Sequence, residues 1–305
     1  MELRHLRYFI GVVEAGSLTT AAERRLHISQ PALSRQIRDL EYQVGTELLS
    51  RSVRGVELTA AGKVFLDHAR LALAQVDAGV EGARRAAQPA KKTFAIGFQT
   101  GHEMNWLPQA MQVLRDELKN TQVTVSSDYS PDLADALLRG RLDVAFMRVE
   151  AAFDLAYEVV DQEPLIVLMP SDHRLIAQEA IHPREFIGEI FIGGSKKAAV
   201  LRAVTEDYLR RSGLDIKLDH GVDNVTMAMS LVASTRGLSL MPSYAKTMLP
   251  WSVVSRPLQG EAPTIDLAVG YTKANSSPIL KLFLSRLEEL RAAGSYATAA
   301  RHLTM

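Results

Sequence analysis

SLTTAAERRLHISQPALSRQIRDLEYQVGTELLSRSVRGVELTAAG, residues 17–62, is the stretch on which the organisation of the chain depends. Its centre predicts a helix that starts at Ser29, because Ser is a favoured N-cap and Pro31 in the first turn loses no hydrogen bond. An apolar stripe recurs along this helix at helical spacing and consists of Leu33, Ile37, Leu40 and Val44. The side away from that stripe carries Arg35 and Arg38, which we therefore expect to face outward.

A second helix is predicted just before the first, over residues 18–26, and the link between the two allows only a sharp turn. Two helices joined this tightly are typical of a helix-turn-helix, whose second helix enters the major groove of DNA. Downstream, apolar and polar residues alternate in LLSRSVRGVELT on either side of residues 53–55, which predicts a two-stranded hairpin. Such a hairpin beside the second helix is a wing, with Arg51 and Arg54 near its tip. Upstream, apolar residues from Leu3 to Val13 predict a further helix that closes the small core.

Three segments, MELRHLRYF, AAERRLHISQPALSRQIRDLE and LTAAG, resemble the winged helix-turn-helix of LysR-type transcriptional regulators. Length and segment order extend the likeness over the whole chain. One departure is that AAERRLHISQP has one residue more before Gln30 than is usual in the family, which bears on the register of the turn near Arg24 and Arg25. The residues expected to contact DNA are Ser29, Gln30, Pro31, Ala32, Ser34, Arg35, Arg38, Arg51 and Arg54.

Composition neither demands nor excludes a DNA-binding protein. The chain of 305 residues has no net charge, but residues 1–92 hold 14 Lys and Arg against 10 Asp and Glu, a net +4 that the remainder offsets. A basic N-terminal part agrees with phosphate contacts. An exposed arginine such as Arg35 is also common as a solvated surface charge, so the whole pattern of helices, cap and wing carries the interpretation.

Several classes of protein are disfavoured by what the sequence lacks. There is no cysteine, no signal peptide and no run of 18 apolar residues, so we expect a cytoplasmic protein without a membrane span. No nucleophile elbow, P-loop or metal-binding His motif occurs, and the eight His residues are scattered, so we expect no catalytic residue, no metal and no cofactor. The alternatives are an enzyme or a stand-alone small-acid binding protein; the second would require export.

After the wing, Thr59 is expected to cap a long helix ending near Gln88. Its Ala-rich stripe, with Gly79 and Gly82, favours pairing with a second copy over folding back on its own domain. Strands alternating with helices then predict open parallel sheets covered by helices. The resemblance implies a two-lobed α/β effector domain of the type-2 periplasmic-binding-protein fold. We expect a DNA-binding domain at 1–58, a linker helix at 59–88 and an effector domain at 91–305, with lobe I at 91–162 and 267–305 and lobe II at 163–266.

Small molecules bind beyond the carboxyl ends of strands in such sheets, where helix N-termini supply N–H groups. This rule, together with the family's cleft-lining segments, gives the expected effector-binding residues: Gln99, Thr100, Gly101, Ser130, Arg148, Gly194, Ser195, Lys196, Asn224, Val225 and Thr226. Hydroxyls, backbone N–H groups and the charges of Arg148 or Lys196 suit a carboxylate, and we expect Phe98, Val225 and Leu267 to line an apolar remainder. Thr100 and Ser130 are equally plausible as simple helix caps, and Arg148 as a surface partner of Glu150 or Asp154.

Within the family, the resemblance is greatest to regulators of aromatic-acid catabolism that respond to phenylpropionate, benzoate or muconate. It implies a regulator that binds double-stranded DNA as a homodimer or homotetramer, with RNA polymerase as a candidate partner. A small organic, aromatic carboxylate inducer is expected to change promoter binding and bending. The identity of the acid, the operator, and the choice between activation and repression are not encoded in any motif we can read.

Overall fold

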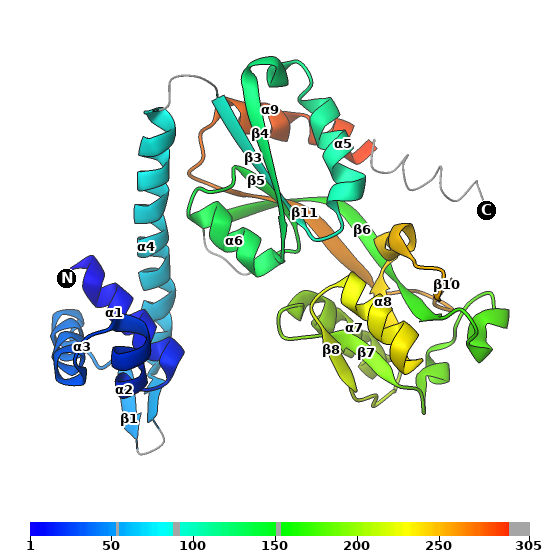
Figure 1. Cartoon of the computed structure of the whole chain (residues 1–305), viewed down its shortest axis with the longest axis horizontal. Coiled ribbons are helices and arrows are strands. Elements are labelled where there is room, and N and C mark those ends of the chain that lie inside the picture. Colours follow the sequence, from blue (N-terminus) through cyan, green and yellow to red (C-terminus); the bar gives the residue numbers. More distant parts are fainter. Residues whose placement is uncertain (53–54, 88–91, 151–153, 293–305) are drawn as a thin grey trace. The chain divides into compact units, whose positions relative to one another are not determined.

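The structure, a computed structural model, describes residues 1–52, 55–87, 92–150 and 154–292. Contacts divide the chain into two units, residues 1–87 with 138–140, and residues 88–137 with those from 141 onward. Figure 1 shows the helices and strands of each unit. The first unit contains α1 (Leu3–Ala15), α2 (Leu18–Ala21), the π-helical turn η1 (Ala22–Leu26), α3 (Gln30–Val44), β1 (Leu49–Ser52), β2 (Gly55–Leu58) and α4 (Ala60–Ala86).

The core of the first unit is built from the stripe that the sequence predicts on α3. Leu33, Ile37 and Leu40 are fully buried and pack with Phe9 of α1. Phe9 also meets Phe65 of α4 edge to face, with ring centroids 5.3 Å apart. The predicted wing is present as β1 and β2, which pair antiparallel with only two residues between them. The helix-turn-helix and its wing are thus confirmed.

The helix predicted at residues 18–26 is divided into α2 and the π-helical turn η1. In η1 the N–H of His27 bonds to the carbonyl of Ala22, five residues back, and His27 then adopts left-handed dihedrals with φ 49°. A π-turn holds one residue more than an α-turn. This π-turn lies in the segment where the sequence has its additional residue, and Leu26 packs on Gly11 of α1, where a Cβ would lie 3.2 Å from its side chain.

Helix α4 starts as expected after Thr59, whose Oγ1 accepts a hydrogen bond from the N–H of Gly62 at 2.9 Å. Its apolar stripe is buried only near its beginning. Phe65 and Ala69 pack into the core of the first unit, whereas the later members Ala72, Val76 and Val80 are exposed. A 27-residue helix therefore continues as an apolar surface beyond the domain that it caps.

The second unit begins with elements close to those expected: β3 (Lys92–Gln99), α5 (Glu103–Val113), the 3₁₀ turn η2 (Glu117–Asn120), β4 (Thr121–Asp128), α6 (Ser130–Leu138) and β5 (Val144–Met147). The long strand β6 (Leu155–Pro170) and the 3₁₀ turns η3 (Arg174–Ala177) and η4 (Pro183–Phe186) follow. The chain continues through β7 (Phe191–Gly194), α7 (Ala199–Arg211), β8 (His220–Val222), α8 (Val225–Thr235), β9 (Leu238–Pro242) and η5 (Ser243–Met248). It closes with β10 (Val253–Pro257), β11 (Thr264–Thr272) and α9 (Pro278–Ser285), and residues 287–292 are again helical.

The strands form one sheet in the order β4-β3-β5-β11-β6-β9-β7-β8, with β10 paired to β6. The predicted parallel pairing is present in β4-β3-β5 and in β8-β7-β9. The antiparallel pairs made by β6, β10 and β11 were not predicted. β6 joins both halves: its first part pairs with β11 and its last part with β9 and β10. Figure 1 shows β6 and β11 as the two strands that run from one half to the other. The two-lobed α/β architecture is confirmed.

The second half of β6 explains why its sequence is apolar without interruption. Leu165, Val167 and Met169 face the core under α7, whereas Ile166 and Leu168 face the core under α8. A strand covered by helices on both sides reads as a continuous apolar run. The first half, Leu155–Pro164, is mixed in polarity and lies beside β11, so it carries no such signal.

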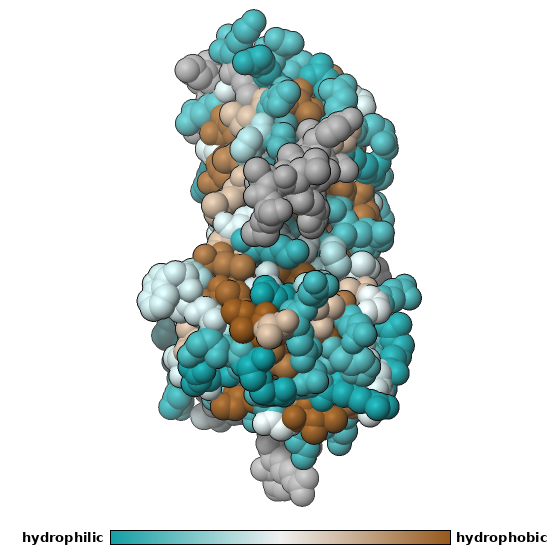
Figure 2. Space-filling view, turned by 90° about the vertical axis from the view of Figure 1, so that its right-hand side faces the viewer, coloured by the Kyte–Doolittle hydropathy of each residue, from teal (hydrophilic) through white to brown (hydrophobic). Residues whose placement is uncertain are grey.

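On the face that Figure 2 shows, hydrophilic residues surround several groups of hydrophobic residues. Among the helices described, none combines the length and the apolar composition that a bilayer crossing requires.

Candidate functional site

The outer face of α3 presents the side chains that the sequence singles out. Pro31, Ala32, Arg35 and Arg38 are exposed, and Ser34 is partly exposed. Among the described residues no carboxylate pairs with Arg35 or Arg38; Arg38 Nε only donates to the carbonyl of Ser34 at 3.4 Å. Ser29 occupies the N-cap position, but its hydroxyl makes no capping bond. The first turn of α3 therefore offers N–H groups to an external acceptor. The next two turns present two guanidinium groups that no carboxylate among the described residues neutralises.

The wing residues are placed less completely. Arg51 lies in β1, paired with Val56 of β2. Its side chain and the whole of Arg54 lie outside the described residues, so their contacts with DNA stay predictions.

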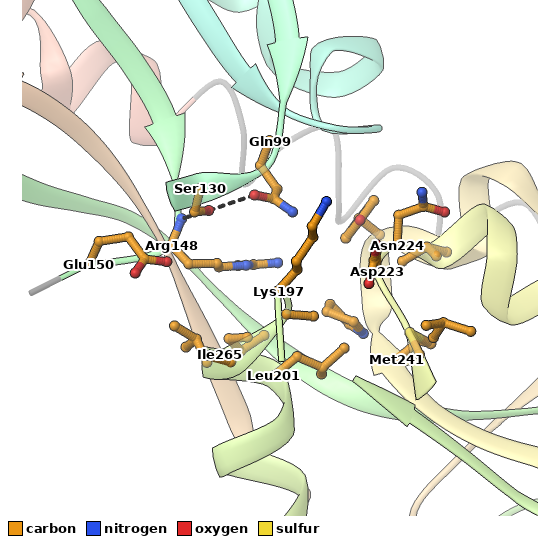
Figure 3. Close-up of a pocket in the computed structure, with 17 residues that line it drawn as sticks. Gln99, Ser130, Arg148, Glu150, Lys197, Leu201, Asp223, Asn224, Met241 and Ile265 are labelled. Carbon is orange, nitrogen blue, oxygen red and sulfur yellow. Dashed lines mark hydrogen bonds between the residues drawn. The ribbon is translucent and has the colours of Figure 1, made fainter. Parts of the chain in front are cut away.

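A pocket lies in the second unit, between the ends of β3, β5 and β8 and the first turns of α7 and α8 (Figure 3). It holds about 520 Å³ of open space, its mouth included. Its polar lining comes from Gln99, Ser130, Arg148, Glu150, Lys197, Asp223, Asn224 and Tyr244. Its apolar lining comes from Ala198, Ala199, Val200, Leu201, Val222, Val225, Met241, Pro242 and Ile265.

Ser130 is occupied by bonds within the protein. Its hydroxyl donates to Gln99 Oε1 and accepts the N–H of Arg148 at 2.9 Å. Because Gln99 accepts through its oxygen, its amide nitrogen is left to point into the pocket, as Figure 3 shows. Gln99, rather than Ser130, is therefore the hydrogen-bond donor at this wall.

Arg148 is buried with only 6% of its surface exposed, and its charge is already compensated. Its Nη2 donates to Glu163 Oε2 at 2.6 Å, and its Nη1 donates to the carbonyl of Asp266 at 2.9 Å. Glu163 also lies 3.2 Å from His102 Nε2. Burial raises the pKa of Glu163, but His102 and Arg148 outweigh it and lower the pKa to about 2. The cluster ties the end of β5 to both β6 and β11.

Tyr244 of η5 joins the two halves of the unit from the other side. Its hydroxyl donates to the carbonyl of Thr100 at 3.2 Å, and its ring lies 3.9 Å from the imidazole of His102. Burial raises the pKa of the Tyr244 phenol well above its usual value. Asn224 makes a second link across the pocket, donating through Nδ2 to the hydroxyl of Tyr129 at 3.1 Å.

Lys197 supplies the positive charge that remains available. Among the described residues no carboxylate pairs with it, and its Nζ lies 5.6 Å from the centre of the Tyr129 ring. It immediately precedes α7, whose N-cap residue Ala198 has no capping side chain. The first intrahelical bond of α7 joins the N–H of Arg202 to the carbonyl of Ala198, and the N–H groups of Lys197 and Ala198 bond to Ser195. Among the described residues no acceptor bonds to the N–H groups of Ala199, Val200 and Leu201, which line the pocket. A lysine and an uncapped helix N-terminus together favour an anion.

Two family models match the chain. The first is the bacterial regulatory helix-turn-helix protein, lysR family, over residues 3–63, and the second is the LysR substrate binding domain over residues 87–292. The chain belongs to the LysR family of transcriptional regulators. Members of this family are regulators and not enzymes, and they combine a DNA-binding helix-turn-helix with an effector-binding domain.

Relatives in the LysR family resemble the chain over almost its full length. The Hca operon transcriptional activator HcaR of Escherichia coli is 34% identical over 95% of this chain and 98% of its own. The HTH-type transcriptional regulator BenM of Acinetobacter baylyi is 32% identical over 85% of this chain and 86% of its own. The crystal structure of full-length BenM matches with a TM-score of 0.55 and 27% identity, covering 98% of each chain. Full-length CbnR complexed with its target DNA, 24% identical over 95% of this chain and all of its own, has the same fold with a TM-score of 0.56.

Five of the effector-binding residues predicted for this LysR protein line the pocket: Gln99, Ser130, Arg148, Asn224 and Val225. The others do not. Those outside the lining are Thr100, Gly101, Gly194, Ser195, Lys196 and Thr226. Thr100 is held by Tyr244, Gly101 packs against Tyr244 and Met248, and Ser195 donates to Asp223.

The prediction that Phe98 and Leu267 line the apolar part of the pocket is wrong. Both are fully buried in the hydrophobic core, where Phe98 stacks on Phe146 with centroids 4.9 Å apart. The alternative surface pairing of Arg148 with Glu150 or Asp154 is wrong too, because Arg148 pairs inward with Glu163. Among the described residues no group of His, Asp or Glu is arranged to hold a metal ion.

The sequence missed Lys197, Glu150, Asp223 and Tyr244 of this LysR pocket. A signal existed for Glu150, which follows Arg148 by two residues and so continues the same side of an extended chain. No signal separated Lys196 from Lys197, because the choice depends on how the loop enters α7. Tyr244 lies on a 3₁₀ turn that periodicity does not reveal.

Proposed function

We propose that this LysR-family regulator places α3 in the major groove of promoter DNA and responds to an aromatic carboxylate bound in the pocket of its second unit. The observation that supports the proposal most is that Lys197, which pairs with no carboxylate among the described residues, adjoins the uncapped first turn of α7. Both features favour a negative charge at one point.

The DNA-binding half of the proposal is supported by the geometry of α3. Arg35 and Arg38 lie on its exposed face, and neither is held by a carboxylate among the described residues. An arginine can donate a bidentate pair of hydrogen bonds to guanine in the major groove. Small side chains on the same face allow the helix to approach the base pairs closely. We propose that Ser29, Gln30, Pro31, Ala32 and Ser34 position the helix, and that Arg51 and Arg54 of the wing contact phosphate groups.

The effector-binding half is supported by the different roles of the polar and apolar residues that line the pocket. Lys197, the amides of α7 and the side-chain nitrogen of Gln99 are donors for a carboxylate. Arg148 is a structural member of the wall, since Glu163 neutralises it. The remaining wall is apolar, with Val200, Leu201, Val222, Met241 and Ile265, which suits an aromatic or unsaturated body. The resemblance to regulators of aromatic-acid catabolism agrees with this choice.

The link between the two functions is proposed to run through oligomerisation. The exposed stripe at Ala72, Val76 and Val80 of α4 is suited to pairing with the same helix of a second copy. We propose a dimer, paired further into a tetramer, in the cytoplasm, with RNA polymerase as a further partner. We propose a DNA-binding domain at 1–58, a linker helix at 59–88 and an effector domain at 91–305, in which residues 163–266 form lobe II. The acid can shift promoter binding and bending only by its differential affinity for two arrangements of the assembly.

Thermal-shift measurements on the full-length protein test the effector-binding half. Benzoate, cinnamate, 3-phenylpropionate and cis,cis-muconate are each titrated to millimolar concentration. A ligand that binds only the folded state raises the unfolding temperature in proportion to the logarithm of its concentration. We expect at least one of these acids to do so, and its amide analogue not to. No shift with any acid would remove the carboxylate from the proposal.

A further inference from the structure

Glu150 is the pocket residue for which the proposed carboxylate gives no role. It lines the wall on the side away from Asn224 and Asp223 (Figure 3). Within the described residues no cation or hydrogen-bond donor reaches its carboxylate. Its backbone is held in place, because the hydroxyl of Tyr157 donates to its carbonyl oxygen at 3.0 Å. The partial burial of Glu150 raises the pKa of its carboxyl group above the usual value.

Two other charged residues of the pocket have partners within the protein. Arg148 is neutralised by Glu163, and Asp223 accepts a hydrogen bond from the hydroxyl of Ser195. Among the described residues no carboxylate pairs with Lys197, and neither a cation nor a hydrogen-bond donor reaches the carboxylate of Glu150. Asp223 has no cationic partner there either, but the Ser195 hydroxyl donates to it. In Figure 3 the side chain of Lys197 extends toward Gln99 and Asn224, while Glu150 lies beyond Arg148 on the opposite side. The described part of the chain therefore places a cation at one end of the pocket and, at the other, a carboxylate to which none of its residues donates.

We infer that the effector carries, besides its carboxylate, a hydrogen-bond donor at its far end, a hydroxyl or an ammonium group, which binds Glu150. This inference rests on the proposed function, because the carboxylate at Lys197 sets the direction in which the effector lies. It makes Glu150 the residue that determines specificity among aromatic acids.

By the same chemistry, two other kinds of acid are expected to bind, but more weakly than an acid that carries the donor. A dicarboxylate would bring its second negative charge toward Glu150, where like charges repel. A plain aromatic acid would cover the carboxylate of Glu150 with hydrocarbon and remove water without replacing its hydrogen bonds. A site with a buried acceptor rejects the analogue that lacks the donor more strongly than a hydrophobic site rejects a missing methylene.

A matched series tests the inference on the full-length protein: 4-methylbenzoate, 4-(hydroxymethyl)benzoate and 4-(aminomethyl)benzoate. The three acids have similar shapes and differ in the donor at the far end. The corresponding 3-substituted acids are run in parallel so that both ring positions are sampled. Calorimetry is expected to give at least one donor-bearing acid an affinity about tenfold or more above that of its methyl analogue. Preference for the hydroxyl or for the ammonium arm identifies the donor.

The variants assign the preference to Glu150. In Glu150→Leu the preference is expected to fall to within about threefold, with the methyl analogue bound as well as or better than before. Glu150→Gln keeps an acceptor without a charge, so it retains part of the preference for the hydroxyl and loses that for the ammonium. Glu179→Leu, at an exposed glutamate outside the pocket, leaves the preference unchanged.

Two results would overturn the inference, and they differ in what they say of the proposed function. Equal affinities of the wild type for the three acids, or a preference that survives in Glu150→Leu, would overturn the role of Glu150 and leave carboxylate binding intact. Failure of every acid in both series to bind would overturn the inference together with the carboxylate.

Discussion

Lys197 and Arg148 both bring a positive charge to the pocket, but only the lysine keeps it available. Arg148 donates hydrogen bonds to the carboxylate of Glu163 and to the carbonyl of Asp266, and its side chain is buried from solvent. A carboxylate that entered would therefore gain little new from Arg148. At Lys197 it would replace water around an exposed ammonium with a charge-assisted bond beside the first amides of α7.

Lys197→Gln is accordingly expected to weaken binding of any acid that the wild type binds, by roughly tenfold or more, since the charge-assisted bond contributes about 1.5–3 kcal/mol. Isothermal titration of the full-length protein measures the change. The matched control is Lys196→Gln, because the neighbouring lysine is also exposed but does not line the pocket. Equal losses in the two variants would show that the effect is one of general charge.

Arg35 is the residue at which sequence recognition is tested. Arg35→Ala is expected to cost about 1–3 kcal/mol on a preferred duplex and little on a random one, if the guanidinium reads a base edge. Arg51→Ala in the wing is expected instead to weaken binding to both duplexes. It should also reduce the slope of the logarithm of the binding constant against the logarithm of the salt concentration by about one unit. Fluorescence anisotropy at several salt concentrations separates the two patterns. Unchanged discrimination in Arg35→Ala would remove it from the reading face.

At the scale of elements, the helices that pack by a regular stripe were predictable. The stripe of α3 is buried as its spacing requires. Elements defined by their neighbours were not. The first half of β6 and the strand β10 have no alternation of their own and are strands because β11 and β6 pair with them.

The site was predictable to the extent that it follows from strand ends. Gln99, Ser130, Arg148, Asn224 and Val225 follow strands or begin helices, and all five line the pocket. What could not be predicted is which donors are already used. The hydroxyl of Ser130 and the charge of Arg148 are satisfied by residues far away in sequence, so spacing carries no trace of the pairing.

Helix α4 carries the element-scale prediction for assembly. Val76→Lys combined with Val80→Lys places two charges on the exposed stripe and is expected to weaken self-association by at least tenfold, because like charges of two copies would meet. Sedimentation equilibrium across a range of concentrations measures the dissociation constant. Val64→Lys is the control, since Val64 is exposed on the same helix but lies outside the stripe. An unchanged association in the double variant would place the interface elsewhere.

At the scale of the whole molecule, the cluster of Arg148, Glu163 and His102 makes stability depend on pH. The pKa of Glu163 in the folded protein is lowered to about 2, so its contribution is fully present above its unfolded pKa, near 4.5. The contribution is lost as the pH falls from about 4.5 toward 2. Asp161, whose pKa is raised by burial and by Glu163, contributes in the opposite direction.

Glu163→Gln is expected to reduce this acid sensitivity and to lower the free energy of unfolding at pH 7 by about 3–5 kcal/mol, because Arg148 is left as a buried unpaired charge. Urea unfolding followed by tryptophan fluorescence reports on this unit, since both tryptophans, Trp106 and Trp251, lie in it. Glu179→Gln serves as the exposed control. A variant as stable as the wild type at pH 7 would show that the pair adds nothing.

We propose that α3 recognises a specific duplex sequence and that an acid bound in the pocket controls this DNA binding. Selection of bound duplexes from a random pool by the full-length protein, at moderate salt and with and without a stabilising acid, tests it most directly. The selected duplexes are expected to converge on half-sites separated by about 34–36 Å or a multiple, and the acid is expected to change the yield or the spacing. A pool that stays random under both conditions would contradict it.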